Sequence, residues 1–324
     1  MIDRQHIAKP VASEYKQFEA DFERTLHSEI PLLQSAIEQV LRSNGKHIRP
    51  LLLLLTAKTC GEPNKIAQDA AVIIETLHTT TLIHDDVVDE TKQRRGRPSL
   101  NAVFDNRIAI LTGDYILSGS IIKAAEIGNL TIIEIIARVC RELSEGELIQ
   151  IDNTEKRTID EDDYLRMIRK KTATLISACS EIGAISVNAP SKTVDKCRLF
   201  GEYLGYCFQI KDDIIDYFID SNIGKPTGND IREGKITLPL LYALKNAPEK
   251  ERLYYLEIID NQDYTPQNIT SLIQFTKQYG GIAYAEKRLM EYKQKAVEII
   301  NSFPASEARK SLLLLADFFS ERTN

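Results

Sequence analysis

The stretch IAQDAAVIIETLHTTTLIHDDVVDE, residues 66–90, decides the fold class. Its apolar residues recur every three or four positions, which is the period of an α-helix, and residues 70–83 are apolar on almost every side. A helix without a polar face lies inside a bundle rather than on its surface. We find no run that alternates like a strand and ends in hairpin-turn residues, so we predict an all-α protein. The same helical spacing recurs in residues 101–128, 131–150, 162–187, 192–219, 236–245, 266–277, 282–301 and 305–320.

The composition is that of an ordinary globular protein. The chain has 324 residues, of which 43% are hydrophobic and 27% are charged, so it is too apolar for intrinsic disorder. Its formal net charge is −6 and no stripe of basic residues is present, which argues against a nucleic-acid partner. The loops between the helical segments are short, so we predict a single domain over residues 1–324, with residues 1–20 as an N-terminal arm.

The cysteines and the N-terminal sequence indicate a cytoplasmic protein. The five cysteines are scattered and form no C-x-x-C pair, so neither a disulfide framework nor a zinc site is expected. Residues 1–20 lack the apolar segment of a signal peptide. The strongest apolar run, Leu51 to Leu55, is far shorter than the roughly 20 residues that cross a bilayer, so we expect no transmembrane segment.

An aspartate pattern occurs twice, as LIHDDVVDE at residues 82–90 and as QIKDDIIDY at residues 209–217. In a helix, Asp85 and Asp89 place their carboxylates one turn apart on one face, and Asp212 and Asp216 do the same. Aligned carboxylates repel each other unless a cation neutralises them. Mg²⁺ is suited to this role because it binds one or two carboxylates together with phosphate oxygens. The predicted metal ligands are Asp85, Asp86, Asp89, Asp212, Asp213 and Asp216.

A solvated acidic helix face is the simpler interpretation of either aspartate pattern alone. Both copies, however, lie among apolar residues, where unpaired carboxylates are costly, and this favours a metal site. A third acidic run at residues 160–163 is instead assigned to the start of a helix, because acidic side chains there interact favourably with the helix dipole.

Basic residues near the expected helix ends add the features of a diphosphate site. They occur in the segments GKHIRP (45–50), RRG (94–96), KKT (170–172), GK (224–225) and GK (234–235). Arginine binds phosphate through two N–H donors and lysine acts as a mobile point charge. Each segment alone is typical of a surface, but Arg94 and Arg95 begin only five residues after Asp89. A divalent cation and basic side chains in one cleft would bind a diphosphate.

These segments together resemble the trans-polyprenyl diphosphate synthases. The stretches LIHDDVVDETKQRRGRPS (82–99) and FQIKDDIIDYFIDSNIGKPTGNDIREGKITLPL (208–240) are similar to the two aspartate-rich motifs of that family. NGKHIRP (44–50) is similar to its N-terminal diphosphate-binding signature. The usual signature has a second glycine and a basic residue where Asn44 and His47 stand, but Lys46 and Arg49 are in place. The similarity extends from about residue 20 over nearly the whole chain.

The resemblance implies an isoprenoid-synthase helical bundle around a deep central cavity, a homodimer, and three Mg²⁺ ions per active site once substrate is bound. It also assigns the substrates to sets of residues. Isopentenyl diphosphate would be held by Lys46, Arg49, His78 and Arg95. The allylic diphosphate, farnesyl or geranyl, would be held by Arg94, Lys171, Thr172, Gln209, Lys225 and Lys235.

The implied reaction is a Mg²⁺-dependent condensation. The metal and the lysines stabilise the departing diphosphate, so that the allylic C–O bond breaks towards a carbocation. The double bond of isopentenyl diphosphate then attacks this carbon and a proton leaves. A class I terpene cyclase and a subunit of a heteromeric prenyl synthase remain as alternatives. A cyclase usually carries a different second metal motif, and a regulatory subunit tends to lose aspartates or basic residues that this chain keeps.

The product length is expected to depend on the residues before the first aspartate motif. Side chains one and two turns before Asp85 lie ~6 and ~12 Å along the helix axis, below the metals. Short-chain members of the family carry bulky aromatic residues one turn before the motif, whereas threonines stand here. We therefore expect an all-trans product of C30 to C50, about C40, for quinone side chains, released through transient contact with a membrane. The residues assigned to the chain-length pocket are Leu77, Thr80, Thr81 and Ser118.

Overall fold

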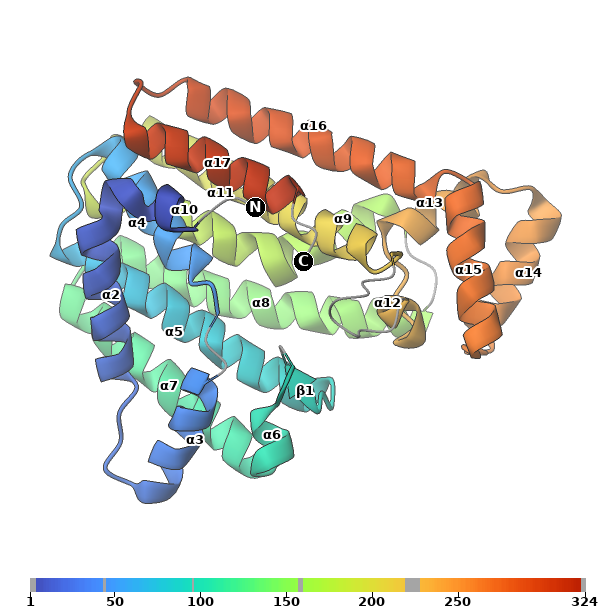
Figure 1. The fold of residues 1–324 in the computed structure, drawn as a ribbon, viewed down its shortest axis with the longest axis horizontal. Coiled ribbons are helices and arrows are strands. Elements are labelled where there is room, and N and C mark those ends of the chain that lie inside the picture. Colours follow the sequence, from blue (N-terminus) through green and yellow to red (C-terminus); the bar gives the residue numbers. More distant parts are fainter. Residues whose placement is uncertain (1–3, 43–44, 95, 157–159, 219–227, 322–324) are drawn as a thin grey trace. The chain divides into compact units, whose positions relative to one another are not determined.

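The computed structural model describes residues 4–42, 45–94, 96–156, 160–218 and 228–321, and these are almost entirely helical (Figure 1). The all-α prediction is confirmed. The chain divides into two compact units. Unit 1 comprises residues 1–137, 178–198 and 301–314, and unit 2 comprises residues 138–177, 199–300 and 315–324. The single-domain interpretation stays a prediction, and each unit is described by its own packing.

Unit 1 contains the N-terminal helices and a short β-ladder. Its elements are α1 (Arg4–Ala8), η1 (Lys9–Val11), α2 (Ala12–Thr25), α3 (Pro31–Arg42), α4 (Ile48–Cys60), α5 (Lys65–Val88), β1 (Gln93–Arg94), β2 (Arg97–Pro98), α6 (Leu100–Val103) and α7 (Asn106–Ile127). The helices that divide between the two units are α8 (Leu130–Lys156), α10 (Thr174–Ser186), α11 (Ser191–Ile215) and α17 (Glu307–Glu321), and one further helix, α16 (Gly281–Asn301), has only its last residue, Asn301, in unit 1.

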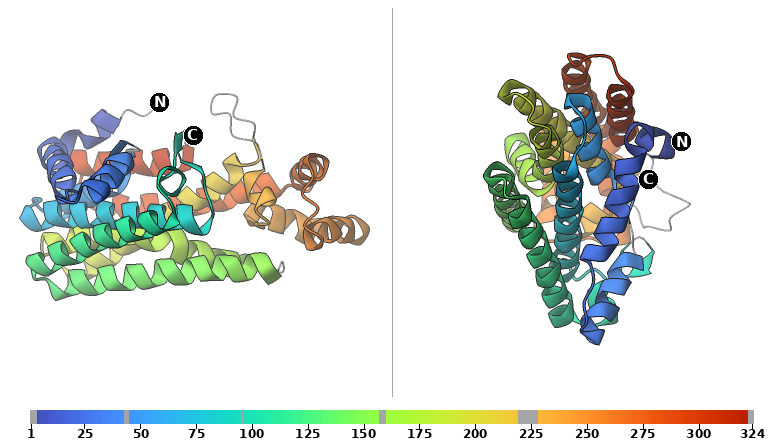
Figure 2. Two further views of the ribbon diagram at one scale, coloured as in Figure 1. Left: turned by 90° about the horizontal axis from the view of Figure 1, so that it is seen from below. Right: turned by 90° about the vertical axis from the view of Figure 1, so that its left-hand side faces the viewer.

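Helix α5 is the central helix of unit 1. It packs against α2, α4 and α7, and α7 runs alongside it in both views of Figure 2. Asn64 stabilises its first turn by accepting a hydrogen bond from the N–H of Ala67 at 3.1 Å. Helix α4 contributes the apolar run Leu51 to Leu55, whose side chains are all fully buried. The burial of this run, in a helix that packs against α5, contributes to the hydrophobic core of unit 1.

Helix α7 buries one face against α5 and exposes an apolar face on its other side. Thr112 and Ile116 are buried, whereas Leu111 is 67% and Ile122 is 61% exposed. Among the described helices, α7 is long and apolar enough to cross a membrane, by length and composition alone. A single helix of this kind is weak evidence, since core helices pass the same test.

Strands β1 and β2 form a two-residue antiparallel ladder that pairs Gln93 with Pro98 and Arg94 with Arg97. The turn between them contains Gly96, whose φ of 74° lies in the left-handed region that favours glycine. The sequence did not predict this ladder because two residues are too few to show a period of two.

Unit 2 contains the remaining helices. They are α9 (Glu161–Ile168), η2 (Arg169–Ala173), α12 (Asn229–Arg232), α13 (Leu238–Asn246), α14 (Glu249–Asp260), α15 (Pro266–Gln278) and α16 (Gly281–Asn301). Asp160 caps α9 by accepting a hydrogen bond from the N–H of Asp163 at 2.8 Å. The interpretation of residues 160–163 as a helix start is therefore confirmed.

The element η2 is a single π-helical turn between α9 and α10. The N–H of Thr174 bonds to the carbonyl of Arg169, five residues earlier. Two glycines from neighbouring helices lie against this turn. A Cβ added at Gly146 of α8 would be 2.5 Å from the nitrogen of Lys171, and one at Gly205 of α11 would be 2.4 Å from the Cα of Ala173. Only glycine at these positions lets both helices approach the π-turn so closely.

Candidate active site

The first aspartate motif lies at the C-terminal end of α5 in unit 1. Asp85 is half-buried, Asp86 is buried and Asp89 is exposed. Helix α5 ends at Val88, and the N–H of Asp89 bonds to the carbonyl of Asp85 at 2.8 Å. Asp85 and Asp89 therefore keep the one-turn spacing that a pair of carboxylates needs to approach one cation.

Asp86 is engaged by the chain that follows α5. Its Oδ1 accepts hydrogen bonds from Nε and Nη2 of Arg94 at 2.8 and 2.7 Å. Asn101 donates to the main-chain carbonyl of Asp86 at 3.0 Å. The β1–β2 turn thus folds Arg94 back onto Asp86, which holds this arginine, while the role of Asp86 as a metal ligand stays a prediction.

Two polar contacts join α5 to the first turn of α4 and to the residue before it. Nδ1 of His47 is 2.8 Å from Oε1 of Glu75, and Nη1 of Arg49 is 2.9 Å from Nε2 of His78. The main-chain carbonyl of Lys46 accepts a hydrogen bond from Arg4 at 3.2 Å. Three of the four residues predicted for isopentenyl diphosphate thus belong to one segment and the helix beside it, while Arg95 lies outside the described residues.

A small cavity in unit 1 brings the two regions together. Its lining includes Gly45, His47, Glu75, His78, Asp86 and Arg94. Arg94, which the resemblance assigned to the allylic diphosphate, therefore faces the same cavity as His78 of the isopentenyl diphosphate set. Polar and cationic side chains converge there on a wall that is otherwise apolar, which is the usual character of a small-molecule site.

Of the predicted chain-length residues, Leu77 and Thr80 are buried and Thr81 is half-buried on α5. The hydroxyl of Thr80 is 3.4 Å from the carbonyl of Gly113, so this side chain faces α7. The prediction for Ser118 is wrong. Its side chain is exposed and hydrogen-bonds to the carbonyl of Asp114, since the helical period places residue 118 on the outer face of α7.

The second aspartate motif lies at the end of α11 in unit 2. Asp212 is half-buried, and Asp216 follows the last residue of the helix. The carboxylate of Asp216 accepts hydrogen bonds from the N–H groups of Asn229 and Asp230 at 2.9 and 3.1 Å. This connection fixes the start of α12 against the motif.

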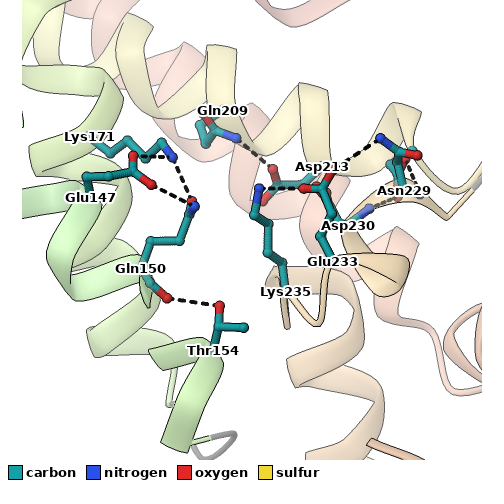
Figure 3. Close-up of polar contacts among 11 residues, drawn as sticks. Glu147, Gln150, Thr154, Lys171, Gln209, Asp213, Asn229, Asp230, Glu233 and Lys235 are labelled. Atoms are coloured by element: carbon teal, nitrogen blue, oxygen red, sulfur yellow. Dashed lines mark hydrogen bonds and ion pairs between the residues drawn. The ribbon is translucent and has the colours of Figure 1, made fainter. Parts of the chain in front are cut away.

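The middle aspartate of the second motif belongs to a chain of buried hydrogen bonds. Tyr164 donates to Oδ2 of Asp213 at 2.6 Å, and the amide of Gln209 donates to Oδ1 at 2.8 Å (Figure 3 shows Gln209 and Asp213). The carbonyl oxygen of Gln209 accepts a hydrogen bond from the hydroxyl of Thr172 at 2.8 Å. Each oxygen of Asp213 accepts one protein hydrogen bond, so this residue orients Gln209, and its role as a metal ligand stays a prediction.

Lysines and polar groups complete the site of unit 2. Lys171 in the π-turn is paired with Glu147 at 2.5 Å and with Gln150 at 3.0 Å, and Lys235 is paired with Glu233 at 2.6 Å (Figure 3). A cavity of about 150 Å³ is lined by five predicted residues, Lys171, Thr172, Gln209, Asp213 and Lys235. Lys225 lies outside the described residues.

Two buried carboxylates in or beside the second aspartate motif, those of Asp213 and Asp230, have raised pKa values. Burial raises the pKa of Asp213 to about 7, and the charges of Asp212 and Asp216 add to the shift against its hydrogen bonds. Burial and the nearby carboxylates of Asp213 and Asp216 also raise the pKa of Asp230 well above its usual value. A set of carboxylate oxygens of this kind fits a divalent cation, which would reduce the repulsion between the neighbouring carboxylates.

The described residues contain no group of three or more His, Cys, Asp or Glu side chains arranged to hold a metal ion. Mg²⁺ does not need such a cage, because one or two carboxylates, waters and substrate phosphates complete its coordination. The predicted metal ligands are Asp85, Asp86 and Asp89 in unit 1 and Asp212, Asp213 and Asp216 in unit 2, and these stay a prediction.

Sequence reasoning missed the partners that hold the predicted residues. Tyr164 lies eight residues before Thr172, which places both on one side of the same helical segment, and this spacing was the available signal. Glu147, Gln150 and Glu75 gave no signal, because their contacts cross from one helix to another.

Known proteins are similar to this chain over nearly its full length. The family model for polyprenyl synthetase matches residues 30–276. The all-trans-nonaprenyl-diphosphate synthase (geranyl-diphosphate specific) of Rhodobacter capsulatus is 34% identical over 323 residues, covering 98% of each chain. Heptaprenyl diphosphate synthase component 2 of Bacillus subtilis (strain 168) is 36% identical over 306 residues, covering 94% of this chain and 86% of the relative.

Solved structures show the same similarity. The crystal structure of a decaprenyl diphosphate synthase from Rhodobacter capsulatus has a TM-score of 0.94 at 33% identity, covering 99% of this chain and 100% of that one. The geranylgeranyl pyrophosphate synthase from Bacteroides thetaiotaomicron has a TM-score of 0.85 at 39% identity, covering 98% and 99%.

Proposed function

Because the chain belongs to the polyprenyl synthetase family and is a prenyltransferase, we propose that it extends an allylic diphosphate with isopentenyl diphosphate to a long all-trans polyprenyl diphosphate. The arrangement of side chains around one cavity supports this proposal most directly. In unit 2, two lysines, a hydroxyl, an amide carbonyl and a buried carboxylate converge on one cavity. Cations suit a leaving diphosphate, and carbonyl and hydroxyl oxygens suit a developing carbocation.

The residues of unit 2 act on the allylic substrate. Lys171 and Lys235 bind its diphosphate and stabilise the charge that grows as the C–O bond breaks. Asp213 holds the amide of Gln209 through its N–H, so the carbonyl oxygen faces the opposite way, towards Thr172. In that orientation the oxygens of the Gln209 carbonyl and the Thr172 hydroxyl, which are the negative ends of their dipoles, can stabilise positive charge on the allylic carbon.

Mg²⁺ would be held by the aspartates of the two motifs, Asp85, Asp86 and Asp89 in unit 1 and Asp212, Asp213 and Asp216 in unit 2. When bound, it would supply charge neutralisation on the diphosphate oxygens. The count of three ions per active site belongs to this proposal and is tested by metal titration of the substrate complex.

The residues of unit 1 act on isopentenyl diphosphate. Lys46, Arg49 and His78 bind its diphosphate and position the double bond for attack on the allylic carbon. Arg94 is held in place by Asp86 and adds positive charge at the cavity that it lines together with His78. The released proton passes to the departing diphosphate, so the products are an allylic diphosphate longer by five carbons, inorganic diphosphate and a proton.

We propose a product of C30 to C50, about C40, because the position one turn before Asp85 carries the small, half-buried Thr81. The names of the relatives support a long chain, since they specify heptaprenyl and nonaprenyl products. The name of the structure from Bacteroides thetaiotaomicron specifies the shorter geranylgeranyl product, so direct measurement is required. A quinone side chain is the use we propose for the product, made in the cytoplasm and released at a membrane.

Thr81→Phe is expected to shorten the product by at least about two isoprene units, because the phenyl ring fills space below the aspartate motif. Thr80 is less suitable for this substitution, since its side chain is packed against α7. Mass spectrometry of the products measures the change. Thr81→Ser is the control that keeps the position small and should retain the long product. An unchanged product distribution in Thr81→Phe would remove Thr81 from the chain-length pocket.

We propose a homodimer that uses the exposed apolar face of α7. Leu111, Tyr115 and Ile122 recur on one side of this helix and are exposed in unit 1, and a face of this kind is typical of an interface. A second copy of the chain is the occupant that the family resemblance implies.

Leu111→Asp combined with Ile122→Asp is expected to convert the dimer to a monomer, since two buried carboxylates per subunit would face apolar surface. Light scattering after size exclusion measures the mass. Leu253→Asp, at a residue of α14 with 56% exposure, is the matched control and should keep the dimer mass. A dimer that persists in the double variant excludes this face.

A subunit of a heteromeric synthase is the second candidate, because one relative is named as component 2 of its enzyme. The experiment that separates the candidates incubates the purified chain alone with Mg²⁺, farnesyl diphosphate and radiolabelled isopentenyl diphosphate. Primer-dependent incorporation that a chelator abolishes supports the proposal. Absence of incorporation until a second chain is added would support the subunit, and primer consumption without isopentenyl diphosphate would support a cyclase.

A further inference from the structure

The sulfurs of Cys60 and Cys197 lie side by side in unit 1, although the two residues are 137 positions apart in the sequence. Cys60 ends α4 and is half-buried, whereas Cys197 lies in the first part of α11 and is 1% exposed. Their Sγ atoms are 3.6 Å apart, and neither cysteine is in a disulfide. Because the sulfurs of a disulfide are ~2 Å apart, a side-chain movement of about 1.5 Å is enough to join them.

The chain beside Cys60 is packed against the end of α10. A Cβ added at Gly61 would be 3.2 Å from the Cβ of Val187, the residue that follows α10. Asn64 donates a hydrogen bond to the main-chain carbonyl of Ser186 at 2.8 Å. These contacts fix the loop that leaves α4, so Cys60 stays beside α11.

The turn of α11 that carries Cys197 is also anchored. Its neighbour Lys196 donates to the hydroxyl of Ser302, between α16 and α17, at 3.1 Å. The same ammonium lies over the ring of Phe303, 6.0 Å from its centroid. The two thiols are therefore held in contact by the structure on both sides.

The two thiols differ in reactivity. When Cys60 is ionised, it accepts a hydrogen bond from the Cys197 thiol, and this bond lowers the pKa of Cys60 despite its partial burial. The same contact, together with burial, raises the pKa of Cys197 well above its ordinary value. The thiolate is the nucleophile in thiol–disulfide exchange, so Cys60 is the attacking sulfur and Cys197 is the buried partner that resolves the product.

The other three cysteines are deactivated by burial. Burial raises the pKa of Cys179 and that of Cys207 to about 12, and it also raises the pKa of Cys140. The Cys207 thiol also donates to the main-chain carbonyl of Leu289 at 3.6 Å. These thiols stay protonated near neutral pH and therefore react slowly. Cys140 is half-buried like Cys60, which makes it the matched control.

We propose that Cys60 and Cys197 are an oxidation site that closes to a reversible disulfide when the protein meets a small disulfide such as oxidised glutathione. The Cys60 thiolate attacks one sulfur of the reagent, which releases one glutathione thiolate and leaves a mixed disulfide on Cys60. The sulfur of Cys197 then attacks that of Cys60, its proton passes to the departing thiolate, and the second glutathione leaves. Two protein thiols are thus oxidised by two electrons, and one reagent disulfide is reduced to two thiols.

The closed form is expected to be more stable than the reduced form. A bond between Cys60 and Cys197 joins α4 to α11 and closes a long loop, which lowers the conformational entropy of the unfolded chain. We therefore expect the midpoint of thermal unfolding to rise by about 5 °C. In a reducing compartment the pair stays open, and oxidation closes it.

The test treats the purified, reduced chain with oxidised glutathione and then stops the reaction with acid. The remaining thiols are labelled with N-ethylmaleimide in denaturant, and the intact mass is measured. We expect three labels rather than five, because two of the five cysteines are joined. Peptide mapping should identify the cross-link between Cys60 and Cys197, and dithiothreitol should restore five labels. Thermal unfolding of both forms measures the change in midpoint.

Single substitutions separate the two steps. Cys197→Ala removes the resolving thiol and is expected to stop at the mixed disulfide, with one glutathione on Cys60. Cys60→Ala is expected to take up no glutathione at Cys197, because that thiol is buried. Cys140→Ala is the matched control and should close as the wild-type chain does.

A wild-type chain that keeps five labels, or a cross-link that joins another pair of cysteines, would overturn the oxidation site. Glutathione on Cys197 in the Cys60→Ala variant would overturn the order of attack. An unchanged midpoint in the closed form would overturn the stabilisation. None of these results depends on prenyl transfer, since mass and unfolding are measured rather than turnover.

Discussion

Asp212→Ala is expected to lower kcat about a thousandfold, because removal of an oxygen ligand takes away several kcal/mol of charge stabilisation at the departing diphosphate. Its carboxylate is half-buried at the end of α11, next to the fully engaged Asp213. The loss is expected in kcat more than in KM, because charge on the diphosphate grows as the C–O bond breaks.

The measurement for Asp212→Ala is the steady-state rate as a function of Mg²⁺ concentration. Asp212→Glu should recover part of the rate at raised Mg²⁺, since it keeps a carboxylate at a shifted position. Asp195→Ala changes an exposed acid of the same helix and should behave as wild type. A rate within a few-fold of wild type in Asp212→Ala would exclude this residue as a metal ligand.

Gly205→Ala is expected to lower kcat about a hundredfold, because displacement of reacting groups by about 1 Å costs that much. The added Cβ would lie 2.4 Å from the Cα and 2.6 Å from the Cβ of Ala173, so the π-turn or α11 must shift. Lys171 and Thr172 precede Ala173 in that turn, and Gln209 follows Gly205 by one helical turn. The substitution therefore disturbs both sides of the hydrogen bond between Thr172 and Gln209.

The free energy of unfolding of Gly205→Ala must be measured together with its reaction rate. Overpacking is expected to lower the free energy of unfolding by about 1–3 kcal/mol, which denaturant titration resolves. Gly119→Ala is the matched control, because its Cβ would meet nothing closer than a methyl group of Thr25 at 3.9 Å. It should keep its rate and gain slightly in stability. A folded Gly205→Ala variant with the wild-type rate would show that the π-turn does not position these groups.

The fold class and the spacing of the aspartates along their helices could be predicted because both depend on the helical period. The helical period sets the face on which Asp85 and Asp89 lie, and the favourable interaction of acidic side chains with the helix dipole predicted that residues 160–163 begin a helix. The period alone does not show which face of a helix meets its neighbour. Ser118 was misplaced for this reason, since the face of α7 opposite to it packs on α5.

Contacts between distant segments could not be predicted. Residues 47 and 75 are 28 positions apart, and Tyr164 and Asp213 are 49 apart, so no local pattern links them. Arg94 turns back to Asp86 because the two-residue ladder and Gly96 reverse the chain, which is too short a feature to show a period. These contacts decide how the predicted residues are oriented, and orientation decides their chemistry.

The mass spectrum of the products formed by the purified chain alone, from farnesyl diphosphate, isopentenyl diphosphate and Mg²⁺, tests the central claim most directly. We expect a ladder of linear polyprenyl diphosphates that increases in five-carbon steps and ends between C30 and C50. A cyclic hydrocarbon that has lost its diphosphate, or unchanged substrates, would contradict prenyl elongation by this chain.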